Sequence, residues 1–377
     1  MKILHISKYY PPYSGGIEDV CYNLVKSLSE EEQKVICFND VNSDNISCDG
    51  KVEIIRIGSI GELASQPISF SYYHKLKVLL KTYVPDIIHL HLPNPLLCFY
   101  VLLLIHDHTK LVLHWHSDIV AQKYIYRLFA PIETRILCRA DKILVTSPQY
   151  LEDSLPLAPY KEKSIVVPNV ISLDKLEMKD ADNDKVKKLK EVYWNKKIIF
   201  FMGRHVPYKG IEYLIEAEKY IQSDCVIFLA GKGPLTSSLR EISKSNRIKF
   251  LGRISDDDVK IYMNAADIFA FPSITKNEAF GVVLAEAMYC KAVPVCFTIQ
   301  GSGVNWVNVN NVTGLEVPNR DAQAFGKAID LLLTNDKLRA KLSDNAHQRV
   351  VDMFTIETVG KQLRDIYKVS FQNWRID

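Results

Sequence analysis

The chain has 377 residues, enough for two domains of ordinary size, and 47% of them are hydrophobic and 24% charged, which excludes extensive disorder. Its formal net charge of +3 is small, and the Lys and Arg residues are dispersed without RNA-binding signatures, so nucleic acid is not an expected partner.

The cysteines and the apolar runs indicate the cellular compartment of the protein. The eight cysteines include no C-x-x-C motif and lie mostly in apolar segments, which is typical of reduced core residues in a cytoplasmic protein. The N-terminal residues lack the apolar core of a signal peptide. The longest apolar run follows Pro95 and is about half of a membrane span, so it predicts a buried helix rather than membrane insertion.

Short β-rich runs alternate with helical patterns along the first half of the chain, which predicts βαβ units and a parallel sheet. The expected strands are 2–7, 34–38, 52–56, 86–91, 110–114, 142–146 and 164–167. A polar run at 174–190 then interrupts the alternation. The predicted first domain therefore covers residues 1–170.

The same alternation begins again in the second half. The expected strands are 196–204, 225–233, 247–253, 267–273 and 292–297, and the expected helices are 210–221, 234–244, 256–264 and 280–290. From 321 onward the pattern is helical only. The last segment, about 356–377, has no strand to pair with, so it must pack on a domain that is already formed. The predicted second domain covers residues 171–355. Two doubly wound α/β domains carry ligands at the carboxyl ends of their strands.

In the first half, Gly15 and Gly16 follow the first strand and open a helix. Glycines there let backbone N–H groups approach an anion, although a glycine pair also simply forms turns. The pair is not part of a G-x-G-x-x-G motif, which argues against a nicotinamide cofactor.

In the second half, Arg204 directly follows a strand and Lys209 directly precedes a helix. Both cations would project from the carboxyl end of the strand, where a phosphate would bind; the alternative is an ordinary solvated loop. The segments 231–234 and 273–281 follow other strands of the same sheet. Several strand ends therefore converge on one ligand.

Two glutamates, Glu278 and Glu286, stand eight positions apart in a small, apolar run. In one continuous helix their carboxylates would be separated by about 80° in azimuth and roughly 12 Å along the axis, too far to share a proton or a metal. Gly281 instead predicts that Glu278 lies in a loop, that the helix begins near Phe280 and that Glu286 lies about two turns inside. Taken alone, both would be solvated charges.

His114 and His116 are two residues apart, so both face the same side if the strand continues through them. Two ligands make an incomplete metal site, and a core or loop histidine is the alternative. The sequence shows no His/Cys cluster and no D-x-D or H-E-x-x-H motif in a plausible place, so no metal is expected.

The motifs "GRHVPYKG", "LAGKGP", "FLGRIS", "DIFAFPS" and "NEAFGVVLAEAM" together resemble the retaining glycosyltransferases of family 4, also called group 1. "SGG", "HWHSDI", "ADKILVTSP" and "VVPNVI" extend the resemblance to the first half. It implies the GT-B fold: two Rossmann-like domains facing a cleft, with a C-terminal helix that crosses back to the first domain. "HWHSDIVAQK" with "GSGVNWVN" is similar to bacterial mannosyl- and rhamnosyltransferases of surface polysaccharide synthesis.

The resemblance implies a role for individual residues. Arg204 and Lys209 hold the diphosphate of a sugar nucleotide, Glu278 lies near the donor sugar, and backbone N–H groups after it serve sugar and phosphates. Glu286 accepts hydrogen bonds from the ribose, and His116 reaches the reacting sugar. The implied catalytic residues are His116, Glu278, Arg204 and Lys209. The implied donor-binding residues are Gly16, Arg204, Lys209, Gly231, Arg253, Ile254, Glu278, Ala279, Phe280, Gly281, Val282 and Glu286. The implied acceptor-binding residues are Gly15, His116, Asp118 and Lys123.

The implied reaction moves a hexose, mannose from GDP-mannose being the first choice, from a nucleotide diphosphate sugar to a saccharide or lipid-linked saccharide. Retention would follow from attack on the same face as the leaving group, so Glu278 is not assigned as a nucleophile. Fixed cations and helix N–H groups would stabilise the departing phosphate, so neither a metal nor another cofactor is expected.

A lipid-linked acceptor would bring the first domain to the cytoplasmic face of the inner membrane. The segment 122–142 carries cations, Lys123, Arg127, Arg135 and Arg139, and before its end only Glu133 opposes them. This charge favours contact with anionic lipid, although a basic solvated helix explains it equally well. A cytoplasmic protein with peripheral membrane contact is the expectation.

Two other functions share this architecture. A sugar-nucleotide epimerase should show an acid and a base on both faces of the sugar, and the matched motifs supply no such pair. A non-catalytic sugar-nucleotide-binding protein would lack the equivalents of Arg204, Lys209 or Glu278, all of which are present. The loop 301–309 departs from the family pattern, and its Asn305, Trp306 and Asn308 either contact the donor or only shape the loop.

Overall fold

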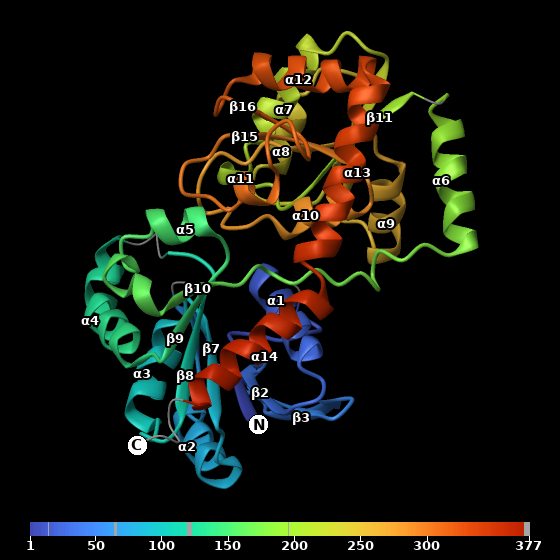
Figure 1. The fold of residues 1–377 in the computed structure, drawn as a ribbon. Coiled ribbons are helices and arrows are strands. Elements are labelled where there is room, and N and C mark those ends of the chain that lie inside the picture. The colour runs from blue at the N-terminus through green and yellow to red at the C-terminus, as the bar shows by residue number, and fades with distance from the viewer. Residues whose placement is uncertain (14, 64–65, 119–122, 195, 373–377) are drawn as a thin grey trace. The chain divides into compact units, whose positions relative to one another are not determined.

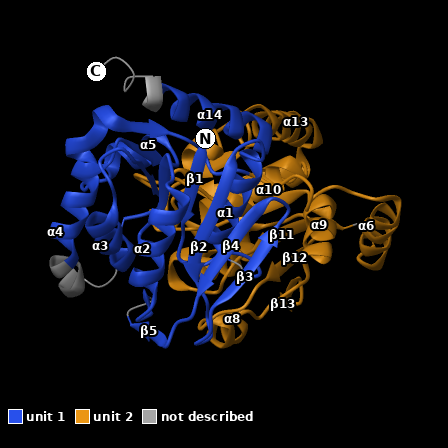
Figure 2. Ribbon diagram, turned by 90° about the horizontal axis from the view of Figure 1, so that it is seen from below, with its two compact units in different colours: residues 1–170, 356–377 blue, residues 171–355 orange. Residues whose placement is uncertain are grey.

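A computed structural model describes residues 1–13, 15–63, 66–118, 123–194 and 196–372. The chain divides into two compact units (Figure 2). Unit 1 contains residues 1–170 and 356–377, and unit 2 contains residues 171–355. These are the ranges at which the sequence pattern changes.

Unit 1 is built on one sheet, whose described strands run in the order β10-β9-β8-β7-β1-β2-β4-β3 (Figure 1). Every neighbouring pair is parallel except β3 with β4 at one edge. The strands are β1 (Lys2–Ile6), β2 (Glu32–Phe38), β3 (Asn45–Asp49), β4 (Val52–Ile57), β7 (Ile87–Leu92), β8 (Lys110–Trp115), β9 (Lys142–Val145) and β10 (Ser164–Val166). A separate hairpin joins β5 (Gly61–Leu63) and β6 (Gln66–Ile68).

The central strands of unit 1 are buried along nearly their whole length because helices cover the sheet on both faces, as parallel sheets require. The helices are α1 (Gly16–Ser27), α2 (Tyr72–Tyr83), α3 (Pro95–Leu104), α4 (Lys123–Arg139), α5 (Pro148–Asp153), the 3-10 helix η1 (Ala158–Lys163) and α14 (Ile356–Gln372). The C-terminal helix α14 lies beside α1 (Figure 1). The last segment thus packs on the first unit.

Unit 2 has a sheet whose described strands are all parallel and run in the order β13-β12-β11-β14-β15-β16. They are β11 (Lys197–Met202), β12 (Cys225–Ala230), β13 (Ile248–Gly252), β14 (Ile268–Phe271), β15 (Val293–Phe297) and β16 (Leu315–Val317). Counted along the chain this order is 3-2-1-4-5-6, that of the Rossmann fold. The strand order reverses between β11 and β14, which is where such sheets bind ligands.

The helices of unit 2 connect and cover these strands. They are α6 (Asp180–Val192), α7 (Ile211–Ala217), α8 (Thr236–Ile242), α9 (Asp256–Ala265), α10 (Val282–Tyr289), α11 (Val304–Val307), α12 (Ala322–Thr334) and α13 (Asp336–Met353), with the 3-10 helices η2 (Pro207–Lys209) and η3 (Glu218–Tyr220). Phenylalanines of β11, β12, β14 and β15 fill the centre of one continuous core.

Several details differ from the sequence expectation. Strands β3, β5, β6 and β16 were not expected, because each is short and pairs at a sheet edge or in a hairpin. Helix α3 is only partly buried: Phe99 and Leu103 are exposed. Cys48 and Cys138 are likewise exposed, whereas the other cysteines are buried. Among the described helices, none combines the length and apolar character needed to cross a membrane.

Candidate functional site

The centre of the candidate site in unit 2 is an ion pair between Lys209 and Glu278. Lys209 ends η2 after β11, and Glu278 lies in the loop after β14, so the pair bridges the two strands at which the sheet order reverses. The two side chains are only 10% and 13% exposed. Burial disfavours the charged lysine, but the Glu278 carboxylate outweighs it, and the pKa of Lys209 is raised.

Two serines hold Glu278 in place. The Ser273 hydroxyl donates to Glu278 Oε2 at 3.1 Å, and the Ser302 hydroxyl donates to the Glu278 carbonyl oxygen. Both serines are fully buried. Neither serine was predicted from the sequence. Ser273 lies two residues after the end of β14, a usable signal, whereas Ser302 is 24 positions from Glu278 and only the fold brings it there.

Arg204 follows β11 and is exposed, in contrast to Lys209. Among the described residues no ion-pair partner of Arg204 is found. Its charge lowers the pKa of the nearby Tyr208, although burial dominates and raises that pKa overall. Lys209 Nζ lies 5.4 Å from the Tyr208 ring centroid. Since the Glu278 carboxylate already compensates Lys209, Arg204 is the cation left available for an anion.

The loops after β11 and β12 pack directly on one another. Gly231 has φ 115°, and a Cβ atom there would lie 1.9 Å from the Gly203 carbonyl oxygen, so no other residue fits. Gly231 N donates to Gly252 O at 2.7 Å, which ties the end of β13 to the same loops. Three adjacent strand ends are thereby fixed together beside the ion pair.

Helix α10 begins at Val282, with Gly281 as its N-cap, and no described side chain caps it. The N–H groups of its first turn are therefore free to bind an anion or hydroxyl groups. The expected helix start near Phe280 was two residues early. Glu286 is consequently about one turn inside the helix rather than two.

The other donor-site residues differ in what they can contribute. Phe280 is buried against Trp306 and Phe354, so only its backbone is available. Glu286 is half-buried in α10 and interacts with other groups of the chain. Ala279 and Val282 are half-buried beside it.

The segment after β13 was expected to lie near the base of the donor. Arg253 is exposed and Ile254 is half-buried. The Ser255 hydroxyl accepts a hydrogen bond from Asp258 N and so caps α9. Arg253 and Ile254 are thus accessible to a ligand, whereas the Ser255 hydroxyl is already used as the cap of α9.

The loop 301–309 is held together by its own side chains. Asn305 Oδ1 accepts from Ile299 N at 2.7 Å, and Asn308 is fully buried with its Oδ1 accepting from Thr313. Trp306 packs on aromatic residues and lies 5.7 Å from the Arg349 guanidinium. All three residues therefore contribute to the shape of the loop.

In unit 1, His116 lies just beyond β8 and is buried. Its Nε2 lies 3.0 Å from His91 Nδ1. Burial lowers the pKa of His116 to about 3, so the ring is neutral near pH 7. The ring of His114 stacks on it with centroids 4.2 Å apart, so both histidines face one side as expected.

The expectation that the chain has no His/Cys cluster is wrong. His5, His89, His91, His114 and Cys21 form groups whose ligand atoms lie within 4.8 Å of one another. Sequence spacing revealed only the pair on one strand. The other histidines come from neighbouring strands, whose pairing only the fold determines.

The remaining residues of unit 1 lie at the ends of strands and helices. Gly15 caps α1, and Gly16 is its exposed first residue, where a Cβ atom would meet nothing within 4 Å. Asp118 Oδ1 accepts from Trp115 Nε1 at 2.9 Å and from Ser154 Oγ at 2.7 Å, so its carboxylate orients the loop. Lys123 begins α4.

The charges of α4 are less free than the sequence suggested. The side chains of Lys123 and Arg127 lie outside the described residues. Arg139 binds Asp141 and donates to two backbone carbonyl groups. Glu133 is buried, and Arg135 is exposed. Among the expected cations whose side chains the structure describes, Arg135 is therefore the one available to a membrane surface.

Comparison with known proteins identifies the family. The model for Glycosyltransferase Family 4 matches residues 14–175, and the model for Glycosyl transferases group 1 matches residues 182–349. The chain belongs to the group 1 glycosyltransferases. One match lies largely in unit 1 and the other lies within unit 2.

This glycosyltransferase has relatives that align over nearly its whole length. It is 29% identical over 368 residues to the O-antigen chain mannosyltransferase C of Escherichia coli, covering 95% of each chain. It is 28% identical to the D-rhamnosyltransferase WbpZ of Pseudomonas aeruginosa, covering 94% of this chain and 92% of the relative.

Solved structures share its fold. Sucrose-phosphate synthase from Thermosynechococcus elongatus superposes with a TM-score of 0.81 at 23% identity, covering 99% of each chain. HepE from Anabaena in complex with UDP superposes with a TM-score of 0.77 at 20% identity, covering 98% of this chain and all of that one. The glycosyltransferase therefore has the GT-B fold.

Proposed function

We propose that this glycosyltransferase transfers a hexose from a nucleotide diphosphate sugar bound by unit 2, with retention of the anomeric configuration. The observation that carries the proposal is the convergence of Arg204, the Lys209–Glu278 pair and the start of α10 at the strand-order reversal of the sheet. Two cations and uncapped N–H groups suit a diphosphate.

The chemistry follows from where charge develops. Breaking the glycosyl–phosphate bond places negative charge on the departing diphosphate and positive charge on the anomeric carbon. In our proposal Arg204, Lys209 and the N–H groups of α10 stabilise the first charge, and the Glu278 carboxylate stabilises the second. The diphosphate therefore needs no divalent metal, and added Mg²⁺ or Mn²⁺ should leave the transfer rate unchanged.

The other residues complete the donor and reaction sites. Glu286 accepts hydrogen bonds from the ribose, and Gly231 with Arg253 and Ile254 lies along the base. His116 reaches the reacting sugar through its neutral ring. The acceptor hydroxyl attacks from the side of the leaving group, and a donor phosphate oxygen takes its proton.

For the donor and acceptor we propose mannose from GDP-mannose and a saccharide or lipid-linked saccharide of a surface glycan. The proposal is supported by the names of the full-length relatives, an O-antigen mannosyltransferase and a D-rhamnosyltransferase. A lipid-linked acceptor implies peripheral contact of unit 1 with the cytoplasmic face of the membrane, with Gly15, Asp118 and Lys123 on the acceptor side.

The test is a panel of sugar nucleotides screened for thermal stabilisation and slow donor hydrolysis. One nucleotide, GDP-mannose in our proposal, should raise the melting temperature of the wild-type protein. Lys209→Ala should weaken that binding about 10-fold or more, because a charge-assisted hydrogen bond contributes about 1.5–3 kcal/mol.

Glu278→Ala is the second variant, and it should reduce donor hydrolysis. The matched control is Lys291→Ala, which removes an exposed lysine of the same unit that pairs with Asp344. A panel in which no nucleotide binds, or in which both site variants behave like the control, would contradict the assignment of the donor site.

A further inference from the structure

A column of buried histidines lines one face of the unit 1 sheet. The pairing of β1, β7 and β8 places His5 opposite His89, and His91 opposite His114. Because side chains alternate along a strand, His89 and His91 share this face with the others. The five rings, His5, His89, His91, His114 and His116, stack with centroids 4.2–6.1 Å apart between neighbours.

The ring nitrogens of this column are only partly satisfied. His5 Nε2 lies 3.1 Å from Gln33 Oε1, and His91 Nδ1 lies 3.0 Å from His116 Nε2. The opposite nitrogens, His5 Nδ1 and His91 Nε2, are buried and have no hydrogen-bond partner. Both rings are completely buried, so each unsatisfied nitrogen carries a desolvation cost.

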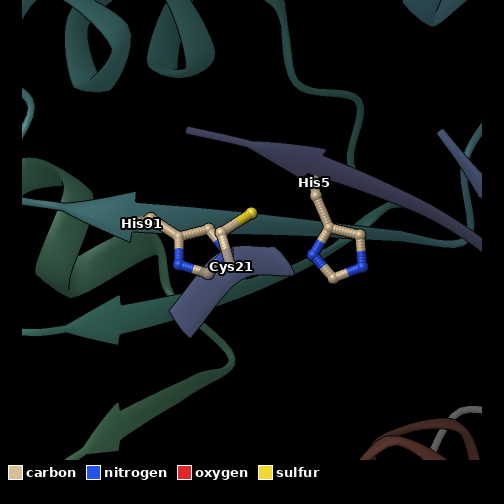
Figure 3. A group of neighbouring side chains, drawn as sticks. All are labelled: His5, Cys21 and His91. Atoms are coloured by element: carbon tan, nitrogen blue, oxygen red, sulfur yellow. The ribbon is translucent and has the colours of Figure 1, made fainter. Parts of the chain in front are cut away.

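Helix α1 presents a thiol to the same place. Cys21 is fully buried, and it forms a group with His5 and His91 whose ligand atoms all lie within 4.8 Å of one another (Figure 3). The Ser7 hydroxyl next to the end of β1 is also buried and has no hydrogen bond of good geometry. Burial raises the pKa of the Cys21 thiol, and the Ser7 hydroxyl lowers it in part. Two imidazoles and a thiol are ligands that thiophilic d¹⁰ ions prefer.

We propose that His5, Cys21 and His91 bind a d¹⁰ metal ion, Zn²⁺ or Cu⁺, in the interior of unit 1. The ion would bind the unpartnered nitrogens of both histidines and the Cys21 thiolate, at distances of about 2.0–2.3 Å. Zn²⁺ would take water or the Ser7 hydroxyl as a fourth ligand, whereas Cu⁺ is satisfied by three. Binding releases the thiol proton to solvent.

A second set, His89, His91 and His114, also lies within ligand distance. Both ring nitrogens of His89 are already occupied, Nδ1 by the Tyr367 hydroxyl at 2.5 Å and Nε2 by His114 Nδ1 at 3.2 Å. An ion there would have to break a hydrogen bond. The set containing Cys21 loses none, which is why we assign the ion to it.

The proposed ion would act in two ways. It would join α1 to strands β1 and β7, and so fix the helix that Gly15 and Gly16 open. It would also fix His91 with Nδ1 protonated, because its Nε2 binds the metal, and that N–H would donate to His116 Nε2. His116 would then carry its own proton on Nδ1. His91 is thus a positioning residue for His116.

The test uses the untagged full-length protein produced in medium supplemented with zinc, copper or cobalt in turn. Elemental analysis after extensive dialysis should find about one equivalent of zinc or copper per chain, and which of the two is retained identifies the ion. The cobalt-loaded protein should show a thiolate-to-cobalt charge-transfer band, since Co²⁺ substitutes for Zn²⁺ at cysteine sites.

Cys21→Ser should lose both the metal and the band. Cys98→Ser, which changes another buried cysteine of unit 1, should keep both. Wild-type protein with substoichiometric metal and no band would overturn the proposal without relying on any variant. Metal that persists unchanged in Cys21→Ser would also overturn it, since the ion would then lie elsewhere.

Discussion

At the residue scale, the stability of the Lys209–Glu278 pair depends on the desolvation of both charges and on their mutual attraction. Each charge loses its hydration on burial, and the mutual attraction together with the Ser273 hydrogen bond compensates for this loss. In the absence of ligand each partner neutralises the other. A bound diphosphate would offer Lys209 a second anion while Glu278 turns to the sugar.

Removing one partner should therefore cost more stability than removing both. Glu278→Gln leaves a buried lysine unpaired and should lower the free energy of unfolding by about 3–5 kcal/mol. The double variant Lys209→Met/Glu278→Gln should recover part of this loss, since no buried charge remains. Urea unfolding of the wild type, Lys209→Met, Glu278→Gln and the double variant gives the coupling energy. Strict additivity would show that the pair does not interact in solution.

Also at the residue scale, the column of buried histidines in unit 1 makes the free energy of unfolding depend on pH. Burial lowers the pKa of His5 to about 4 and that of His116 to about 3, and it holds those of His89, His91 and His114 well below the usual range. In the unfolded chain these groups accept protons near pH 6.5. The unfolded state thus binds more protons below that pH.

The free energy of unfolding should therefore be fully developed above pH 6.5 and fall as the pH decreases toward 4, by up to about 1.4 kcal/mol per pH unit for each histidine. Denaturant unfolding at pH 7.5, 6.5 and 5.5 measures the slope. His116→Asn should reduce it, with the exposed His74→Gln as the control. Equal stability at pH 7.5 and 5.5 would contradict the lowered pKa values.

At the scale of elements, helix α14 is bound to unit 1 by specific contacts. Gln362 Nε2 donates to Val166 O, and Arg364 Nη1 donates to Ser27 O, both at 2.8 Å. Gly360 lets α14 approach α1 closely, because a Cβ atom there would lie 2.6 Å from the Ser27 carbonyl oxygen. Removing residues from 356 onward should therefore destabilise unit 1.

The substitution Gly360→Ala, which adds one methyl group, should test the contact between α14 and α1. In an exposed helix Gly→Ala stabilises by about 1 kcal/mol, whereas overpacking costs about 1–3 kcal/mol. Because the clash is with rigid backbone, the second effect should win, and Gly360→Ala should lower the melting temperature. Lys361→Ala, on the exposed side of the same helix, is the control. A Gly360→Ala protein more stable than the wild type would show that α14 does not pack so closely.

At the scale of the whole molecule, the candidate residues are divided between the units. Lys209 and Glu278 belong to unit 2, whereas His116 belongs to unit 1. Nucleotide binding and sugar transfer should therefore separate. Lys209→Ala should weaken both, while His116→Asn should keep the nucleotide-induced shift in melting temperature and lower the transfer rate by about 10²-fold or more, because the reacting sugar is no longer held in position.

Thermal shift with the nucleotide and steady-state kinetics measure the two effects. Tyr367→Phe, which removes the hydroxyl bound to His89 in the same column, controls for disturbance of the histidine packing. If His116→Asn abolished nucleotide binding, the assignment of the donor to unit 2 alone would be wrong.

Local patterns in the sequence determined most of the regular elements and the family. The apolar runs of β11, β12 and β14 predicted buried parallel strands, and the structure confirms them. Arg204 was selected because it follows a strand, Lys209 because it precedes a helix, and Glu278 because of the resemblance to family 4. Family membership and the GT-B fold were confirmed. These features can be predicted from sequence because strand burial, loop position and motif spacing all depend on short stretches of the chain.

Only the tertiary structure decided which of these residues meet. The strand order brought Lys209 and Glu278 into one ion pair across 69 positions, recruited Ser302 to hold that glutamate, and turned Asn305 and Asn308 inward. The pairing of β1 with β7 and the packing of α1 likewise assembled His5, His91 and Cys21. A sequence shows spacing along one strand, whereas contacts between strands depend on an order and a register that only the whole fold determines.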